Sequence, residues 1–256
     1  MFILAKVYKV RDNIRLSTDE STSIDPGVSI ITITNRPNYI NHVLNNFSIQ
    51  NYGNKEMIIV LHGSHMNIEE YRNRTKSLEN VKVFQFAKTA HYGECCNFAF
   101  RQTHHDYIAV FDDDDYYAPN YLKQSTNILS TSNCDIVGKK SFYIYFEAIK
   151  TLAICFPGAE NQYVNNVADS SMVIKRKVLK KLGFPCPSDE GVLRIFQMNC
   201  HKQGFKIYSI HKFNYVVHRH PDPSKNHSWR ISEDELLKYC HIIKRNLTDY
   251  SSYIKL

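Results

Sequence analysis

From residue 28 to residue 138, apolar runs rich in β-branched residues alternate with segments of helical periodicity, and this alternation constrains the fold more than any other feature. The first run, VSIITIT (28–34), has the composition of a strand buried on both faces. After it, Ile40, Val43 and Phe47 recur on one face of a helix. Further strands are predicted at 56–61, 81–86 and 107–111, with helices at 67–78, 93–104 and 119–131. This spacing indicates βαβ units and therefore an α/β fold with a mostly parallel sheet.

The second half of the chain has a mixed pattern, and no Pro/Gly/Ser-rich linker separates it from the first. The expected strands are 134–147, 151–156, 170–175, 205–210 and 213–220, and the expected helices are 191–203 and 232–245. The predicted organisation is an N-terminal extension or peripheral hairpin over 1–26, a main domain over 27–220, and a C-terminal lid loop and helix over 221–256.

A chain of 256 residues with 43% hydrophobic and 22% charged residues can bury a sizeable core without disulfides or structural zinc. Its seven cysteines are an odd number and form no C-x-x-C pair, which favours reduced thiols in a cytoplasm. No apolar run reaches the ~18–20 residues of a membrane helix, and MFILAKVYKV lacks a signal-peptide cleavage site. We therefore expect a cytoplasmic location.

Four consecutive aspartates, Asp112 to Asp115, directly follow the apolar run YIAVF. In open α/β sheets, ligands bind beyond the carboxyl ends of the strands. Neighbouring carboxylates repel each other unless a cation lies among them, and their oxygens suit Mg²⁺ or Mn²⁺ when phosphates complete the coordination. The run therefore predicts a divalent-metal site, and a solvated acidic loop is the alternative. The net charge of +7 also suits an anionic partner.

Four segments, in this order, resemble family 2 glycosyltransferases of the GT-A fold over roughly residues 27–220. They are VSIITITNRPNYINHVLNNFSIQNY (28–52), MIIVLHGS (57–64), HYGECCNFAF (91–100) and FDDDDYYAPNYL (111–122). Each motif alone is weak, but the ordered set is specific. The resemblance implies a GT-A fold, in which a Rossmann-like nucleotide-binding half joins a mixed acceptor-binding half. Parts of the chain, including GFKIYS, are also similar to the Firmicute branch with spore-coat and cell-surface glycosyltransferases.

By position, the resemblance implies a nucleotide-binding set and a metal ligand. The nucleotide-binding set comprises Thr34, Asn35, Arg36, His62, Gly93, Asn97, Asp112 and Asp113. The first aspartates of the D-x-D motif would lie near the ribose, and Asp114 would bind the Mn²⁺ or Mg²⁺ that bridges the diphosphate. The metal would neutralise the leaving group. Asp115 is expected to cap the following segment.

One departure from the family is His62, because family members usually carry an aspartate there that accepts a hydrogen bond from the base N–H. A neutral imidazole can also accept, so a nucleobase contact and a plain loop position both stay open. A UDP-sugar is the expected donor, although this departure weakens the assignment of uracil.

The catalytic base is the least certain part of the site. The resemblance implies an inverting displacement in which a carboxylate takes the proton of the acceptor hydroxyl. In the family this is usually the Asp of a Glu-Asp pair at a helix start, but counting back from Gly204 leads to Val192 and Leu193. The candidates are therefore Asp189 and Glu190, slightly upstream, and helix capping is the alternative role for both.

Near the C-terminus, His218 and His220 lie at i and i+2 of a predicted strand. The resemblance implies that they complete the metal or diphosphate shell, while Arg219 and Arg230 could meet phosphate oxygens. The alternative is a strand end and a loop with unremarkable histidines. The basic stretch 175–181 could contact an anionic membrane peripherally, although a solvated helix surface is the favoured reading.

The first hypothesis is thus an inverting, metal-dependent glycosyltransferase that uses a nucleoside-diphosphate sugar as the donor. Its acceptor would be a glycan or glycoconjugate, such as a cell-surface, spore-coat or other polysaccharide. A catalytically inactive nucleotide-sugar-binding module is the second hypothesis, because the usual Glu-Asp pair is missing. A nucleotidyltransferase ranks third, since TITNRPNY lacks the glycine-rich loop that holds a triphosphate. No recognisable nucleic-acid motif accompanies the positive charge, so no nucleic-acid partner is expected.

Overall fold

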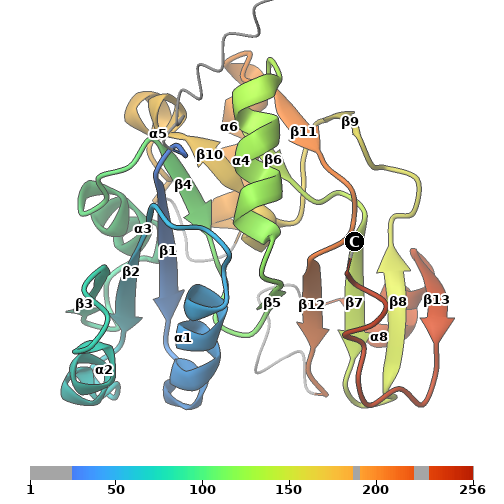
Figure 1. Ribbon diagram of the computed structural model, residues 1–256, viewed down its shortest axis with the longest axis horizontal. Helices are drawn as coiled ribbons and strands as arrows, with labels where there is room; N and C mark the ends of the chain where they lie inside the picture. Colours follow the sequence, from blue (N-terminus) through green and yellow to red (C-terminus); the bar gives the residue numbers. More distant parts are fainter. Residues whose placement is uncertain (1–24, 187–190, 222–230, 256) are drawn as a thin grey trace, which may run out of the picture.

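The computed structural model describes residues 25–186, 191–221 and 231–255 of the chain. These residues form two β-sheets, and helices cover both faces of the larger one (Figure 1). The strands are β1 (Val28–Thr34), β2 (Lys55–His62), β3 (Val81–Phe86), β4 (Tyr107–Val110), β5 (Tyr116–Tyr117), β6 (Ile136–Gly138), β7 (Phe142–Phe146), β8 (Thr151–Cys155), β9 (Gln162–Val164), β10 (Val173–Lys175), β11 (Ile207–Ser209), β12 (Tyr215–Arg219) and β13 (Cys240–Lys244). The α-helices are α1 (Ile40–Ser48), α2 (Ile68–Thr75), α3 (Tyr92–Arg101), α4 (Tyr121–Thr131), α5 (Arg176–Leu182), α6 (Val192–Lys202) and α8 (Glu233–Leu237), and the short 3-10 helices are η1 (Pro37–Tyr39) and η2 (Asp169–Ser171).

The larger sheet has the strand order β3-β2-β1-β4-β10-β6-β11-β9. Its first four strands are parallel and correspond to the four apolar runs of the first half, so the predicted α/β sheet is confirmed. β10 then pairs antiparallel with both β4 and β6. Since β1 and β4 are parallel neighbours, their carboxyl ends meet at one edge of the sheet.

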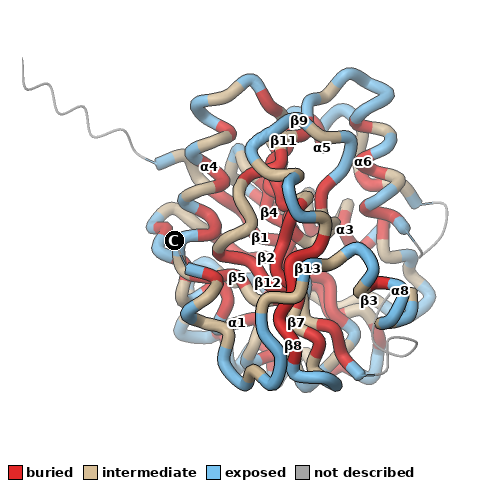
Figure 2. The backbone as a smooth tube through the Cα atoms, turned by 90° about the vertical axis from the view of Figure 1, so that its right-hand side faces the viewer, coloured by how far each residue is buried: buried red, intermediate tan, exposed pale blue. Residues whose placement is uncertain are grey.

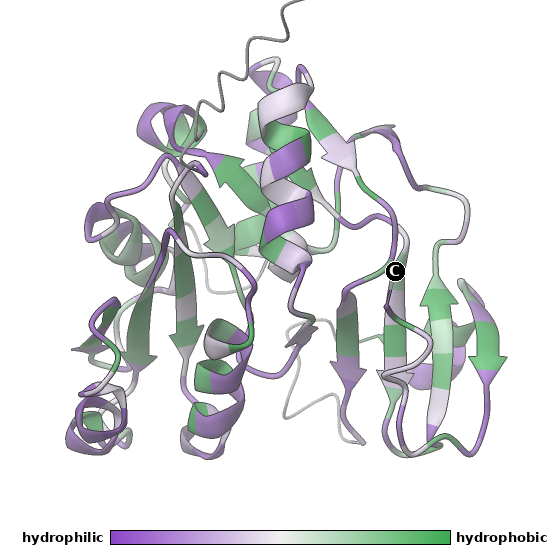
Figure 3. Cartoon of the chain, viewed as in Figure 1, coloured by the Kyte–Doolittle hydropathy of each residue, from purple (hydrophilic) through white to green (hydrophobic). Residues whose placement is uncertain are grey.

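The central strands of this sheet are buried on both faces because their apolar side chains alternate between two cores. Ile30 of β1 packs in one core with α1, α2 and α4, and Ile31 packs in the other with α3, α5 and α6. Figure 2 shows the buried strands at the centre and exposed helix surfaces outside them. Figure 3 shows the matching pattern of apolar strands and helices that are apolar only in part. No helix in the described ranges is both long and apolar enough to cross a bilayer.

The smaller sheet has the order β13-β8-β7-β12-β5, and it contains the predicted antiparallel pair β7–β8. The single strand expected over 134–147 is wrong, because β6 belongs to the larger sheet and β7 to the smaller one. The chain changes sheets at Lys139, whose buried Nζ donates to the carbonyls of His211 at 2.6 Å and Phe213 at 2.7 Å. These hydrogen bonds are long-range, so the local sequence pattern does not reveal the break.

The helix expected over 232–245 is also wrong beyond its first turns. Ser232 caps α8, since its Oγ accepts a hydrogen bond from the Glu235 N–H at 3.3 Å. The chain then forms β13, which pairs antiparallel with β8. Pairing with an open strand edge outweighs local helical periodicity here. The hairpin expected within 1–24 and the lid loop expected over 222–230 lie outside the described residues.

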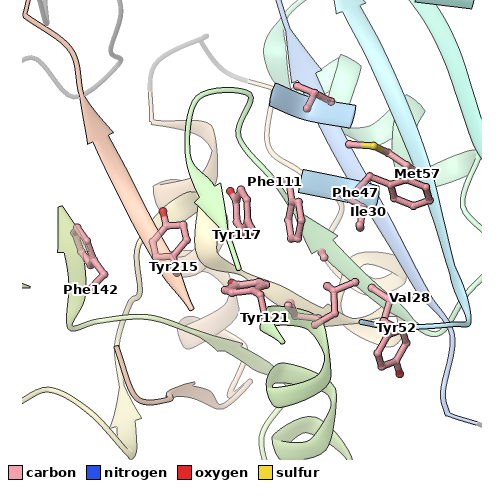
Figure 4. Packing of buried hydrophobic residues seen from close by; sticks show 14 of the residues in the cluster. Val28, Ile30, Phe47, Tyr52, Met57, Phe111, Tyr117, Tyr121, Phe142 and Tyr215 are labelled. Atoms are coloured by element: carbon pink, nitrogen blue, oxygen red, sulfur yellow. The ribbon is translucent and has the colours of Figure 1, made fainter. Parts of the chain in front are cut away.

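A row of aromatic side chains joins the two sheets next to the aspartate run (Figure 4). The rings of Phe111 and Tyr117 stack with centroids 3.7 Å apart, and Tyr215 of β12 follows at 5.3 Å from Tyr117. The Tyr117 hydroxyl accepts from the Asp112 N–H at 2.8 Å and donates to the Ser170 carbonyl at 2.9 Å. This packing holds the aspartate run between β4 and the smaller sheet.

Candidate functional site

The four aspartates lie beyond the carboxyl end of β4, as the sequence predicts, but their surroundings differ. The Asp112 side chain is 48% exposed, whereas Asp113, Asp114 and Asp115 are buried. Burying several carboxylates next to one another is unfavourable unless cations or hydrogen-bond donors compensate them. Each buried aspartate therefore has identifiable partners.

Asp113 and Asp114 are held by residues that follow β1. The Arg36 guanidinium contacts Asp113 through Nε at 3.1 Å and Asp114 through Nη1 at 2.7 Å. The Thr34 hydroxyl donates to Asp113. Arg36 also lies over the Tyr39 ring, 4.8 Å from its centroid. The parallel pairing of β1 and β4 brings these groups together, so four expected site residues, Thr34, Arg36, Asp113 and Asp114, are neighbours in space.

Asp114 stays ionised despite its burial. Burial alone would raise its pKa, but hydrogen bonds from His220 and Arg36, together with the charge of Arg36, lower it to about 2. The Asp113 pKa is raised, because burial outweighs the opposing effect of Arg36. The two neighbours thus differ in basicity, and Asp114 is the stronger candidate for a permanent anionic ligand.

The acidic cluster fits a divalent cation. Side-chain oxygens of Asp112, Asp113 and Asp114 all lie within 4.8 Å of one another. An all-carboxylate donor set suits Mg²⁺ or Mn²⁺. Arg36 Nη1 and His220 Nε2 both contact Asp114 through its Oδ2.

His220 is the C-terminal residue that reaches this cluster. Its Nε2 lies 3.1 Å from Asp114 Oδ2 and 3.0 Å from the Tyr39 hydroxyl. His218 points elsewhere, since its Nδ1 is 3.0 Å from Glu147 and its Nε2 is 2.6 Å from the Tyr250 hydroxyl. His218 lies in β12 and His220 directly follows this strand. The His220 ring contacts Asp114, whereas His218 reaches Asp115 through its backbone N–H.

Asp115 does not cap the following segment, contrary to expectation. Its Oδ2 accepts hydrogen bonds from Ser170 Oγ at 2.6 Å and from the Tyr215 hydroxyl at 2.7 Å, and its Oδ1 accepts from the His218 N–H at 3.2 Å. Burial raises the pKa of this carboxyl to about 6, and the repulsion by Asp114 adds to the shift. Asp115 therefore fastens the aspartate run to η2 and β12.

Asn35 and His62 flank the cluster at the ends of β1 and β2. The Asn35 carbonyl accepts a hydrogen bond from His65 Nε2 at 2.8 Å. His62 Nε2 lies 2.7 Å from the Ala90 carbonyl and must donate to it, because a carbonyl only accepts. In the neutral ring, Nδ1 is then the acceptor. This is the hydrogen-bonding property that the family's aspartate would supply.

Gly93 and Asn97 of α3 hold the segment that leads toward α6. The Asn97 side chain accepts from the Phe184 N–H and donates to the Phe184 carbonyl, both at 2.8 Å. A Cβ at Gly93 would lie only 2.1 Å from the Pro185 carbonyl oxygen. Asn97 also lines an open pocket with Phe86, Glu94, Arg101 and Cys186. The nucleoside contact expected for both residues remains a prediction.

Replacing Gly93 with alanine should destabilise the protein by about 1–3 kcal/mol, because the methyl group forces the Pro185 backbone away from α3. Chemical denaturation of the variant measures this change. Gly53→Ala is the matched control, since a Cβ at Gly53 meets nothing within 4 Å. Equal denaturation midpoints for the two variants would contradict the close packing of α3 on this segment.

Asp169 of η2 is a further carboxyl group near the cluster, next to the Asp115 partner Ser170. Its Oδ1 accepts from the Gln197 side-chain amide at 2.6 Å. Burial raises its pKa from 3.8 to about 6, although Gln197 and Arg194 oppose the shift. The folded state therefore favours the protonated acid.

Because this pKa is higher in the folded than in the unfolded state, the stabilisation by protonated Asp169 is complete below pH ~4 and is lost as the pH rises through about 6. The free energy of unfolding of Asp169→Asn, relative to wild type, should thus increase by up to about 3 kcal/mol from pH 4 to pH 7. Urea unfolding of both proteins at several pH values measures the difference. A difference that is constant with pH would contradict the raised pKa.

Other expected site residues fall elsewhere. Asp189, Glu190 and Arg230 lie outside the described residues. Arg219 is buried and donates to the Ile231 carbonyl, and the phosphate contact expected for it remains a prediction. Sequence reasoning missed Tyr39, although it lies within the segment 28–52. It also missed Glu147, Ser170 and Tyr250, which lie outside the four quoted segments.

Residues 29–151 match the family model for glycosyl transferase family 2. An uncharacterized glycosyltransferase of Rickettsia conorii, RC0461, is 28% identical to this chain over 101 residues. The aligned residues are 40% of this chain and 17% of that protein. The chain therefore matches less than a fifth of the length of this curated relative.

Among solved structures, S. aureus TarS 1–349 is similar with a TM-score of 0.60 and 18% identity, over 75% of this chain and 60% of that one. TarS 1–349 in complex with UDP-GlcNAc matches with a TM-score of 0.60 and 17% identity, over 80% and 61% of the two chains. The mannosyltransferase PcManGT from Pyrobaculum calidifontis, in complex with GDP-Man and Mn²⁺, matches with a TM-score of 0.61 and 16% identity, over 85% and 63%. At these identities the likeness concerns the fold, and it confirms the predicted GT-A architecture.

Proposed function

Because residues 29–151 match the model of glycosyl transferase family 2, we propose that this chain transfers a sugar from a nucleoside-diphosphate sugar to a glycan or glycoconjugate acceptor. The observation that best supports this proposal is the cluster of Asp112, Asp113 and Asp114, whose oxygens lie within 4.8 Å of one another at the carboxyl end of β4. The expected acceptors are cell-surface, spore-coat or other polysaccharide chains, and the expected donor is a UDP-sugar.

Asp114 and its neighbours would hold the divalent ion, and His220 would complete the shell. The ion, when bound, supplies positive charge that stabilises the diphosphate leaving group. Arg36, already beside Asp113 and Asp114, carries a guanidinium that can bind a phosphate oxygen in a forked geometry. Asp112, the exposed member of the run, is the one most accessible to a ribose.

The base of the nucleotide would lie near the ends of β1 and β2. Thr34 ends β1 and Asn35 follows it, and His62 ends β2. Since His62 Nε2 donates to the Ala90 carbonyl, its Nδ1 can accept the N–H of a uracil or guanine ring. Gly93 and Asn97 would border the nucleoside on the α3 side.

For the transfer step we propose Asp189 or Glu190 as the base that removes the proton of the acceptor hydroxyl during an inverting displacement. Both precede α6, whose amino end favours a carboxylate. The second candidate function, a module that binds nucleotide-sugar without transferring it, is favoured by one observation. The positions where the family places its Glu-Asp pair are Val192 and Leu193, which are buried apolar residues.

A thermal-shift panel tests the proposal, with UDP, GDP, dTDP and CMP each added with and without Mn²⁺. One nucleoside diphosphate should stabilise the protein only with Mn²⁺, by about 2.7 kcal/mol at a hundred times its Kd, or roughly 5–10 °C in Tm. No shift with any nucleotide would overturn the donor site. A Tm shift with a nucleotide, together with neither transfer of the sugar to a glycan acceptor nor hydrolysis of the matching nucleotide-sugar, would favour the binding module.

A further inference from the structure

A chain of hydrogen bonds runs from the acidic cluster to the C-terminal segment. His220 Nε2 is 3.1 Å from Asp114, and His220 Nδ1 is 2.8 Å from Glu147 Oε2. The other Glu147 oxygen lies 3.0 Å from His218 Nδ1, and His218 Nε2 lies 2.6 Å from the Tyr250 hydroxyl. Glu147 is thus the central link between the two histidines.

Strand pairing puts Glu147 at this point. β7 and β12 are parallel neighbours in the smaller sheet (Figure 1), with Phe146 opposite Arg219. Glu147, the residue after β7, therefore lies beside His220, the residue after β12, and the Glu147 N–H donates to the Arg219 carbonyl at 3.0 Å. The carboxylate is placed by backbone pairing and not by a flexible loop.

The chemistry of a carboxylate determines how the histidines are oriented. Glu147 only accepts, so each histidine donates its Nδ1 hydrogen to it. For His220 this arrangement directs Nε2 toward Asp114 and the proposed ion. Metal-binding histidines are commonly oriented in this way by a second carboxylate.

From this geometry we propose that Glu147 is a positioning residue for the metal site, which holds His220 in place for the cation bound at Asp114. The inference rests on the proposed function, because the proposed ion is the one that the donor needs. It also extends the site to the C-terminal segment, since Tyr250 orients His218 at the other end of the chain of hydrogen bonds.

The C-terminal segment is itself attached to β7, so Tyr250 is not an isolated contact. The Tyr145 hydroxyl donates to the Leu247 carbonyl at 2.7 Å, and the Leu247 N–H donates to the Lys150 carbonyl at 2.8 Å. The rings of Tyr145 and Tyr250 lie 5.3 Å apart. Displacing this segment would therefore remove Tyr250, the partner of His218 Nε2.

The test is Mn²⁺ binding in the presence of UDP, and of GDP in parallel, measured from the loss of the free Mn²⁺ electron paramagnetic resonance signal. Glu147→Gln should weaken Mn²⁺ affinity by about 10–100-fold. Glu160→Gln is the matched control, because Glu160 is another half-buried carboxylate in an ion pair, with Lys212, and lies outside the chain of hydrogen bonds. Its Mn²⁺ affinity should equal that of the wild type.

Tyr250→Phe keeps the ring and removes only the hydroxyl, so it tests the same chain of hydrogen bonds if Glu147→Gln fails to fold. It should weaken Mn²⁺ affinity in the same direction, by about 2–10-fold, less than the loss of a directly orienting group. Wild-type affinity in folded Glu147→Gln overturns the inference while the proposed function stands. If Glu147→Gln does not fold, wild-type affinity in Tyr250→Phe overturns it instead. Failure of wild-type protein to bind Mn²⁺ with either nucleotide overturns the proposed function and, with it, the inference.

Discussion

Asp114→Asn is expected to abolish the Mn²⁺-dependent stabilisation by the nucleoside diphosphate and to lower sugar transfer by about 100-fold or more. Asp114 has the lowest pKa of the aspartate run, about 2, and is the aspartate that both Arg36 and His220 contact. An amide of the same shape removes the negative charge that the ion needs. The thermal-shift panel and a transfer assay with the matching nucleotide-sugar measure the two effects.

The control for this variant is Asp135→Asn. Asp135 is also paired with a cation, since its Oδ1 lies 2.6 Å from Lys177 Nζ, and its pKa is also lowered. It precedes β6, which runs in the same direction as β4, so it lies at the opposite edge of the sheet from the acidic cluster. A full Mn²⁺-dependent shift in Asp114→Asn, equal to that of Asp135→Asn, would show that the ion binds elsewhere.

Asp115→Ala is expected to destabilise the protein by about 2–4 kcal/mol, the largest stability effect of any substitution in the run. The buried carboxylate accepts hydrogen bonds from Ser170, Tyr215 and the His218 N–H, and alanine would leave these donors without their acceptor. Since the raised pKa shows that the ionised form is itself costly, the loss is smaller than for a buried ion pair.

Chemical denaturation of Asp115→Ala measures this loss, and two neighbouring variants make the comparison specific. Asp115→Asn keeps one carbonyl oxygen and should cost about half as much. Asp112→Ala changes an exposed side chain and should stay within about 0.5 kcal/mol of wild type. Similar denaturation midpoints for Asp112→Ala and Asp115→Ala would mean that Asp115 does not fasten the aspartate run to β12.

Local sequence is enough to predict the first half of the fold. The runs that became β1, β2 and β4 are mainly apolar because they lie between two helical layers, and that requirement appears directly in composition. The second half follows a different rule. Whether residues 134–147 form one strand or two depends on Lys139 bonding to His211 and Phe213, more than seventy residues away in the chain.

The candidate site also has a part that the sequence predicts and a part that only the structure shows. Asp112 to Asp114, Thr34 and Arg36 follow directly after strands, and neighbouring parallel strands bring such residues to one edge, so the sequence predicts them together. The GT-A family resemblance likewise depends on the order of these short motifs. Whether His220 or His218 meets the cluster depends on the contacts of side chains from distant segments.

The sequence by itself therefore determined the parallel α/β half, the resemblance to family 2 glycosyltransferases and the acidic cluster, because these depend on composition and spacing within short segments. Only the tertiary structure decided which histidine contacts Asp114, that Asp115 is an internal anchor, and that Glu147 and Tyr250 join the site. The physical reason is that these contacts depend on the pairing of β7 with β12 and on the attachment of the C-terminal segment to β7. Neither association leaves a periodic pattern in the sequence.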